Sequence, residues 1–236
     1  MDWFNSDYYH KLYKNRDHKE ARNFIDNITK YLNLKKDSKV LDLACGIGRH
    51  ATYIQKIGFD VIGTDRSQNN INKAKVSEND KLSFIQMEMI DNTNYKYDII
   101  LNLFTSFGYV DHDYNLKTIK NIERQLKDDG VLIIDFMNTS FVKKNLVKEE
   151  TKIIDNLEFK IKRRYDRNYI IKEIRFNDKS EYFFKEKVMD LGINNFKKYL
   201  NKYKLKIIKT FGSYDLDKFE LDKSERLIMI IKKSQP

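Results

Sequence analysis

The chain has 236 residues, which is enough for one domain with a full hydrophobic core and one elaboration. Its single cysteine, Cys45, excludes an internal disulfide and is typical of a reducing compartment. No apolar run approaches the roughly 20 residues that cross a bilayer, and the first residues lack the basic and apolar regions of a signal peptide. We therefore expect a cytoplasmic protein without membrane contact.

The net charge of +10 is unevenly distributed along the chain. Residues 143–209 hold 20 Lys and Arg against 10 Asp and Glu, whereas residues 1–142 hold 20 of each. A basic segment attracts an anionic substrate or nucleic acid, but it is more typical of a solvated sheet face that lysines keep soluble. Because a charge bias alone names no partner, nucleic-acid binding is an open but less favoured alternative.

The N-terminal segment predicts an aromatic stretch followed by an amphipathic helix. Asp17-His18-Lys19-Glu20 forms a potential capping box before apolar residues at helical spacing. These apolar residues are Ala21, Phe24, Ile25, Ile28 and Leu32. We expect the helix to pack on a sheet, with His10 and His18 at the surface.

The segment from Val40 to His50 is the most informative part of the sequence, because it has the pattern of a strand, a glycine turn and a helix start. Gly46 and Gly48 lack Cβ atoms, so the backbone can come close to a ligand. The helix start offers free N–H groups to a ligand carboxylate. Asp65 ends a second strand, where a carboxylate can accept both ribose hydroxyls of a nucleoside. The pattern predicts a nucleoside-cofactor site.

Two cofactors compete for this turn. Gly46-x-Gly48-x-x-Ala51, with an acid 19 residues after Gly46, matches the dinucleotide fingerprint. Asp42, however, disfavours an anionic pyrophosphate and favours a cationic amino-acid tail. S-adenosylmethionine has such a tail, so we expect it, and not NAD, to be the cofactor.

From residue 38 to residue 136 strands and helices alternate, which predicts a parallel sheet with helices on both faces. Helices are expected after Gly48, Ser67 and Asp113. From residue 151 the pattern changes to strand-like runs separated by turn residues. These runs are Glu158–Tyr165, Tyr169–Phe176 and Glu181–Met189. They predict an antiparallel meander, which a helix and two last strands follow at Leu205–Phe211 and Arg226–Ile231.

Five motifs occur in order within residues 38–136. They are Asp42–His50, Asp65, Ser83–Met89, Tyr97–Phe104 and Leu126–Asp135. Together they resemble the core of a class I S-adenosylmethionine-dependent methyltransferase. Two positions depart from the pattern: Ala44 stands where many members have glycine, and Glu88 stands where an aspartate normally contacts the adenine amino group.

The resemblance implies a cofactor site built from the N-terminal segment, the glycine turn and the strand ends. The implied cofactor-binding residues are Tyr13, Arg16, Asp42, Ala44, Cys45, Gly46, Gly48, Arg49, Asp65, Arg66, Glu88, Met89, Asn102, Leu103 and Phe104. Tyr9, Tyr13 and Arg16 either close over the methionine carboxylate or pack as an aromatic terminal segment. No group of Cys and His has zinc spacing, so no metal is expected.

The implied reaction is an in-line displacement at the sulfonium methyl, which leaves S-adenosylhomocysteine. Since the donor is already activated, the enzyme mainly supplies position. His112 is the candidate base, with a plain surface histidine as the alternative, and Tyr109 is the candidate for orienting the acceptor.

The whole chain is expected to form one α/β domain, with a Rossmann-like doubly wound sheet of seven strands. The last strand is antiparallel, and an antiparallel β-meander is inserted after strand five. The expected segments are an N-terminal lid and helix (1–37), the cofactor-binding core (38–136), the β-meander insertion (137–190), and the last helix with strands six and seven (191–236).

The place of the meander is similar to that in bacterial amino-sugar and glycine N-methyltransferases. We therefore expect methyl transfer to nitrogen or oxygen of a small molecule held between the lid, the fourth-strand loop and the meander. A homodimer through the meander is possible. The alternatives are an RNA methyltransferase that uses the basic insertion and a non-catalytic S-adenosylmethionine-binding regulatory protein.

Overall fold

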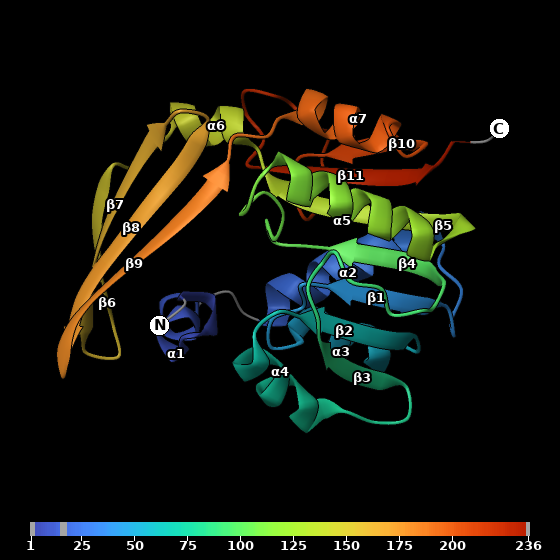
Figure 1. Ribbon diagram of the computed structural model, residues 1–236, viewed down its shortest axis with the longest axis horizontal. Helices are drawn as coiled ribbons and strands as arrows, with labels where there is room; N and C mark the ends of the chain where they lie inside the picture. The colour runs from blue at the N-terminus through green and yellow to red at the C-terminus, as the bar shows by residue number, and fades with distance from the viewer. Residues whose placement is uncertain (1–2, 15–17, 235–236) are drawn as a thin grey trace.

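Two sheets make up the fold that the computed structural model describes for residues 3–14 and 18–234 (Figure 1). The large sheet has the order β10-β11-β5-β4-β1-β2-β3. Its strands are β1 (Lys39–Leu43), β2 (Asp60–Asp65), β3 (Leu82–Gln86), β4 (Tyr97–Asn102), β5 (Leu126–Met137), β10 (Leu205–Phe211) and β11 (Arg226–Lys233). Strands β1 to β5 pair in parallel, whereas β11 is antiparallel to both β5 and β10. The predicted seven-stranded sheet with an antiparallel last strand is confirmed.

Helices cover both faces of the large sheet. They are α2 (His18–Leu32), α3 (Arg49–Lys56), α4 (Gln68–Ala74), α5 (His112–Gln125) and α7 (Ile193–Asn201), with a short 3-10 helix, η2 (Lys75–Ser77), after α4. Side chains from α2, α3 and α4 form one buried cluster, and side chains from α5 and α7 form the other. Within β1, Val40 joins the first cluster and Leu41 the second, as the two-residue period of a strand requires.

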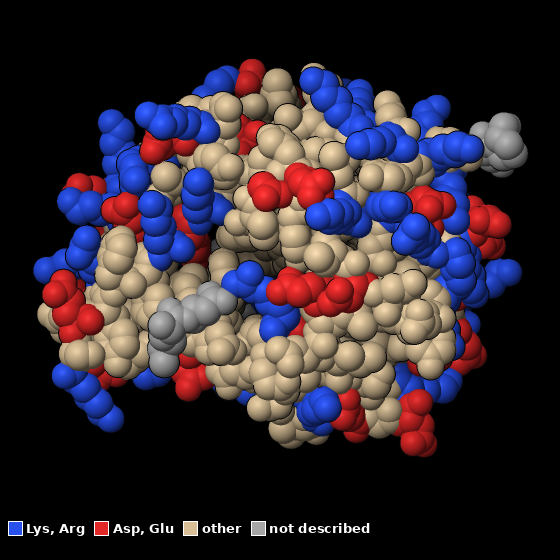
Figure 2. All heavy atoms as spheres, in the orientation of Figure 1, with Lys and Arg blue, Asp and Glu red and all other residues tan. Residues whose placement is uncertain are grey.

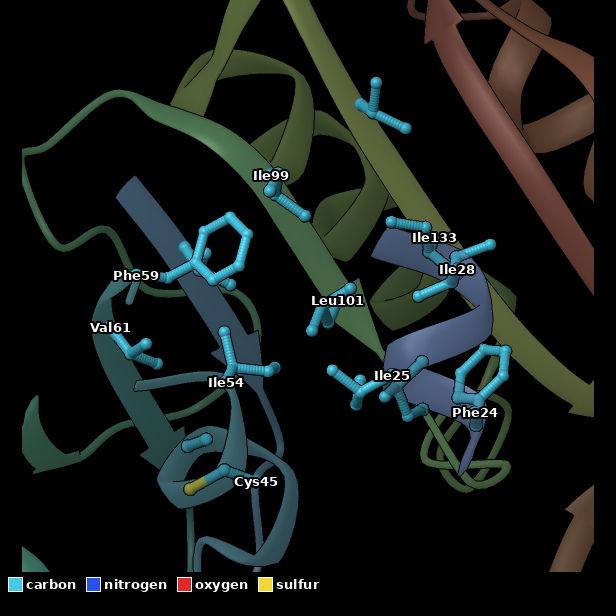
Figure 3. Close-up of a cluster of buried hydrophobic side chains, with 14 of the residues drawn as sticks. Phe24, Ile25, Ile28, Cys45, Ile54, Phe59, Val61, Ile99, Leu101 and Ile133 are labelled. Atoms are coloured by element: carbon cyan, nitrogen blue, oxygen red, sulfur yellow. The ribbon is translucent and has the colours of Figure 1, made fainter. Parts of the chain in front are cut away.

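The first cluster explains why α2 packs where it does. Phe24, Ile25 and Ile28 lie on one side of α2 and point toward Leu101 and Ile133 of the central strands (Figure 3). The residue predicted to start the capping box, Asp17, lies outside the described residues. Helix α5 begins at His112, two residues earlier than predicted, because the carboxylate of Asp111 accepts the N–H of Tyr114 and so caps the helix.

The small sheet follows β5 and the short helix α6 (Thr139–Lys144). It consists of β6 (Glu149–Ile154), β7 (Leu157–Asp166), β8 (Tyr169–Asp178) and β9 (Ser180–Met189), each antiparallel to its neighbour. The predicted meander after strand five is confirmed. The pattern failed to predict β6, because Glu149, Thr151, Lys152 and Ile153 are exposed and leave no apolar alternation to recognise.

The N-terminal segment lies between the two sheets (Figure 1). It comprises the 3-10 helix η1 (Trp3–Asn5) and the helix α1 (Asp7–Leu12), and we call residues 3–14 the lid. Trp3 and Leu12 are buried in a third apolar cluster with meander residues such as Phe159, Ile174 and Phe184. The lid is therefore part of the core of the meander as well as a cover.

The charge excess lies beside the meander and not on it. Residues 149–190, which contain β6 to β9, hold 11 Lys and Arg and 10 Asp and Glu. The excess therefore comes from residues 143–148 and 191–209, and Lys and Arg side chains gather over α7 and β10 in Figure 2. None of the described helices is long and apolar enough to cross a membrane.

Candidate active site

A cavity of about 500 Å³ lies at the carboxyl ends of β1, β2 and β4, the edge at which parallel α/β sheets bind ligands. Its walls are made by the turns after these strands, the segment after β3, and the lid. From the predicted cofactor site the walls include Tyr13, Ala44, Cys45, Gly46, Arg49, Asp65, Arg66, Glu88, Met89, Leu103 and Phe104. Arg16 lies outside the described residues. Gly48, Asp42 and Asn102 do not line this cavity.

The two glycines of the turn have different structural roles. Gly46 has φ +58°, and a Cβ added there would meet nothing within 4 Å, so its backbone faces open space in the cavity. Gly48 has φ +78°, but a Cβ there would lie 2.5 Å from the Phe84 ring. Gly46 therefore allows a ligand to approach, whereas Gly48 allows the helix and sheet to pack. Ala44 also adopts a left-handed φ of +66°, which accounts for the glycine that the similar enzymes have there.

Asp65 is fixed at the end of β2 by backbone donors. Its Oδ2 accepts the N–H of Gly46 at 2.9 Å, and its Oδ1 accepts the N–H of Ser67 at 2.9 Å. The carboxylate thus joins the turns that follow β1 and β2, and it lines the cavity. A carboxylate held in this way is pre-oriented for the hydroxyl groups of a ribose.

Asp42 lies beneath the cavity and is 2% exposed. Burial raises the pKa of its carboxyl to about 7, although the Ala51 N–H donates to it. Its Oδ2, like Oδ1 of Asn102, has no hydrogen-bond partner among the described residues. Buried acceptors normally have donors, so these two orphaned oxygens on adjacent strands fit a cofactor with an ammonium group.

Two further contacts shape the walls. Glu88 Oε2 accepts the Tyr114 hydroxyl at 2.7 Å, so the longer side chain at this position is held by α5. Asn102 donates through Nδ2 to the carbonyl of Leu43 at 3.0 Å, which ties β4 to the end of β1. The predicted side chains therefore gather at one edge of the sheet.

The histidines are arranged differently from the prediction. His10, which was expected at the surface, lines the cavity with its Nε2 2.8 Å from Asn70 Oδ1, and burial lowers its pKa. His50 also lines the cavity, and burial lowers its pKa to about 3. His112 is exposed, its Nδ1 contacts the Tyr199 hydroxyl, and it lines neither this cavity nor the second one described below. Because α5 starts at His112, its ring is directed to α7.

A second cavity of about 580 Å³ lies between the lid, the meander and the loop after β4. The two cavities share Phe4, Tyr9, Tyr13, Phe104, Thr105 and Tyr109. Tyr13 donates its hydroxyl to Glu186 Oε1 at 2.8 Å and accepts from Lys172, which connects the lid to β8 and β9. Tyr109 lines both cavities, and its role in orienting the acceptor stays a prediction.

The loop after β4 separates the cavities and is held in a strained conformation. Phe104 and Thr105 have φ values of +60° and +57°, which cost free energy for residues with a Cβ. Asp135, 1% exposed, compensates: its Oδ2 accepts the Phe104 N–H at 2.9 Å, and its backbone carbonyl accepts the Thr105 N–H at 2.9 Å. Arg226 pairs with Asp135 at 2.7 Å and donates to Thr105 Oγ1. Sequence patterns gave no signal for this pair, because its residues lie 91 positions apart.

Residues 16–175 match a family model described as a methyltransferase domain. Because the match covers more than half of the chain, the chain belongs to this family of S-adenosylmethionine-dependent methyltransferases. The predicted enzyme class and the predicted cofactor, S-adenosylmethionine, are confirmed.

The individual similarities agree with this assignment. A putative methyltransferase of Bacillus subtilis is 31% identical over 123 residues, and the match covers 49% of each chain, so this protein spans about half the length of that curated relative. A solved S-adenosylmethionine-dependent methyltransferase from Clostridium acetobutylicum has a TM-score of 0.82 at 23% identity over 96% of each chain. An amino pentose methyltransferase from Micromonospora echinaspora has a TM-score of 0.73 at 13% identity, covering 97% of this chain and 98% of its own.

Proposed function

We propose that the protein transfers the methyl group of S-adenosylmethionine to nitrogen or oxygen of a small molecule in the second cavity. The observation that carries the proposal is the wall shared by the two cavities, since it places a second cavity directly beside the proposed cofactor site. The similarity to a solved amino pentose methyltransferase supports a small acceptor.

The roles of the residues follow from their positions. Bound S-adenosylmethionine supplies an activated methyl group on sulfur. Gly46 admits the ligand to the turn, Asp65 holds the ribose hydroxyls, and Asp42 with Asn102 favours the cationic tail. The lid covers the cavity and excludes water from it. Asp135 and Arg226 hold the loop after β4 in place between the two cavities. Positioning of the two substrates therefore supplies most of the catalysis.

An acceptor must present a lone pair, so a protonated amine or a hydroxyl must lose a proton. Tyr9, Tyr13 and Tyr109 line both cavities, and of these we propose that Tyr13 and Tyr109 orient the nucleophile. Among the described residues of the second cavity, Glu186 is the one acid, and it receives the Tyr13 hydroxyl bond. We propose Tyr13, backed by Glu186, as the route for this proton in place of the distant His112.

The RNA alternative has less support than it had from sequence. It rested on a basic insertion, but residues 149–190 carry a nearly equal number of acids and bases. A duplex or a loop of RNA also needs an open basic surface, whereas the second cavity is bounded by the lid, the meander and the β4 loop. The non-catalytic alternative does not explain why a second chamber adjoins the cofactor site.

The experiment is methyl transfer from S-adenosylmethionine labelled on its methyl group to a cell extract separated into small molecules, RNA and protein. We expect label in the small-molecule fraction and S-adenosylhomocysteine in equal amount. Label confined to RNA would establish the RNA alternative. Calorimetric binding of S-adenosylhomocysteine without transfer to any fraction would establish the regulatory alternative.

A further inference from the structure

His10 of the lid is a titratable side chain in the wall of the first cavity that the proposed reaction does not use. Helix α1, which carries His10, lies beside α4 (Figure 1). An ion pair of 2.5 Å between Asp7 and Lys73 joins the two helices. Asn5 of the lid also accepts the Ser67 hydroxyl at 2.6 Å. These contacts hold the lid against α4 independently of the hydrogen bonds of the His10 ring.

The hydrogen bonds of Asn70 determine which nitrogen of His10 carries the proton. Nδ2 of Asn70 lies 3.4 Å from the Phe4 carbonyl and 3.3 Å from Asp65 Oδ1, so it is the donating side of the amide. Oδ1 of Asn70 lies 2.8 Å from His10 Nε2, and because an amide oxygen only accepts, Nε2 donates. Burial lowers the pKa of the ring, so at pH 7 the ring is neutral and its Nδ1 is an acceptor. Nδ1 makes no hydrogen bond with any of the described residues.

Asp65 already accepts several hydrogen bonds from the protein. An ionised carboxylate has about four lone-pair positions, which its two oxygens share equally. Its Oδ1 accepts the Ser67 N–H at 2.9 Å and Nδ2 of Asn70 at 3.3 Å, so both positions on this oxygen are taken. Its Oδ2 accepts the Gly46 N–H at 2.9 Å, so one position remains. Asp65 can therefore accept one further donor, whereas a ribose presents two hydroxyls on neighbouring carbons.

The second ribose hydroxyl thus needs an acceptor close to Asp65. Asp65, Asn70 and His10 all line the first cavity. The carboxylate of Asp65 and the ring of His10 are hydrogen-bonded to the two ends of the same Asn70 amide, so they lie near each other in the wall. Nδ1 of His10 is an acceptor that lacks a donor, and a ribose hydroxyl supplies one.

We propose that His10 binds one ribose hydroxyl of S-adenosylmethionine through Nδ1, while Asp65 binds the other through Oδ2. His10 is then a specificity-determining residue that the lid contributes to the cofactor site. The inference rests on one part of the proposed function, the assignment of Asp65 to the ribose. It does not depend on the acceptor or on the second cavity.

The test is calorimetric titration of the full chain with S-adenosylhomocysteine and with its 2′-deoxy and 3′-deoxy analogues. We expect the wild type to bind each analogue about fivefold more weakly than S-adenosylhomocysteine, because each analogue loses one hydrogen bond. In His10→Phe the affinity for S-adenosylhomocysteine should fall by a similar factor. The penalty for one analogue should disappear in this variant, and the penalty for the other should remain.

Two amide substitutions separate ribose binding from the attachment of the lid to α4. An asparagine amide occupies the place of a histidine Nδ1, and a glutamine amide the place of Nε2. His10→Asn can therefore accept the ribose hydroxyl without reaching Asn70, whereas His10→Gln can reach Asn70 and not the hydroxyl. We expect His10→Asn to keep both penalties and His10→Gln to lose one, so this pair carries the test if His10→Phe does not fold. His112→Phe, at an exposed histidine that lines neither cavity, is the control and should change no affinity.

Asp65→Ala distinguishes failure of this inference from failure of its premise, because it should remove the penalty for the analogue that His10→Phe leaves unchanged. If Asp65→Ala loses one penalty and His10→Phe keeps both, His10 does not bind the ribose and the inference is overturned. If His10→Gln keeps both penalties and His10→Asn does not, His10 acts only by holding the lid, which also overturns it. Equal binding of all three ligands by the wild type would refute the assignment of Asp65 as well. Since these readouts need no methyl transfer, they leave the proposed reaction untouched.

Discussion

The two glycines of the cofactor turn predict two different defects from the same substitution. In Gly46→Ala and in Gly48→Ala the new residue must adopt a left-handed φ, of +58° and +78° respectively. This conformation costs about 1–2 kcal/mol for a residue with a Cβ. At Gly48 the Cβ also lies 2.5 Å from the Phe84 ring, and such overpacking adds about 1–3 kcal/mol.

Gly48→Ala should therefore lower the free energy of unfolding by about 2–5 kcal/mol in total. For a chain of this length the corresponding decrease in Tm is about 10 °C. Gly46→Ala should lower Tm by only about 4 °C, because its Cβ meets no protein atom. Its Cβ instead points into the cavity, where a bound ligand would contact the backbone of residue 46. The affinity for S-adenosylhomocysteine should therefore fall at least tenfold.

The assays are thermal unfolding followed by circular dichroism and calorimetric titration with S-adenosylhomocysteine. Gly58→Ala is the control for ligand binding, since Gly58 also has a positive φ, of +109°, but does not line the cavity. The reasoning is refuted if Gly46→Ala binds the ligand as the wild type does. It is equally refuted if Gly48→Ala is as stable as Gly46→Ala.

Three further predictions concern side chains that line the cavities or hold their walls. Arg226→Met leaves Asp135 buried without its ion pair and should lower the free energy of unfolding by about 3–5 kcal/mol in urea titrations; a loss below about 1 kcal/mol would contradict the role of the pair. Burial raises the pKa of Asp42 to about 7 from 3.8 and lowers that of His50 to about 3 from 6.5. Between pH 4.5 and 6 the folded state thus holds a proton on Asp42 that the unfolded state releases, so Asp42 makes stability fall with pH, whereas His50 makes it rise. Asp42→Asn should therefore make the free energy of unfolding rise more steeply with pH, by up to about 1.4 kcal/mol per pH unit. His50→Gln should change this slope in the opposite direction. If the free energy of unfolding of the two variants depended on pH in the same way, these assignments would be contradicted. Tyr13→Phe removes the hydroxyl that joins Lys172 to Glu186. It should decrease the rate of methyl transfer at least tenfold and leave the affinity for S-adenosylhomocysteine unchanged. Full activity of this variant would exclude Tyr13 as the route for the proton.

The cofactor half of the site was largely predictable because its determinants are local. A strand, a turn and a helix start occupy adjacent residues, so the glycines at 46 and 48 and the acid at 65 lie at fixed positions once the βαβ unit forms. Apolar periodicity likewise predicted the strands and the main helices. The edge strand β6 was missed, because an exposed edge has no buried face to leave a pattern.

The acceptor half depends on contacts between distant residues, which a single sequence does not reveal. His10 enters the cavity only because the lid packs against α4, and its Nε2 lies beside Asn70, 60 positions away. Trp3 and Leu12 become core residues only where the meander covers them. Arg163 and Lys172 lie opposite each other only because of the register of β7 and β8. The charge count over residues 143–209 also included the basic residues on either side of the meander, so it did not show that the meander itself is nearly neutral.

The two-cavity account is tested most directly by filling the second cavity and leaving the first intact. Ile170 is 8% exposed on β8 and lines the second cavity alone, so Ile170→Trp would occupy space that the acceptor needs. Val76→Trp, at a position 89% exposed, is the control. We predict that Ile170→Trp binds S-adenosylhomocysteine with wild-type affinity and loses transfer of the labelled methyl group to small molecules, while Val76→Trp keeps both. Undiminished transfer by a folded Ile170→Trp variant would contradict the account, because the acceptor would then bind elsewhere.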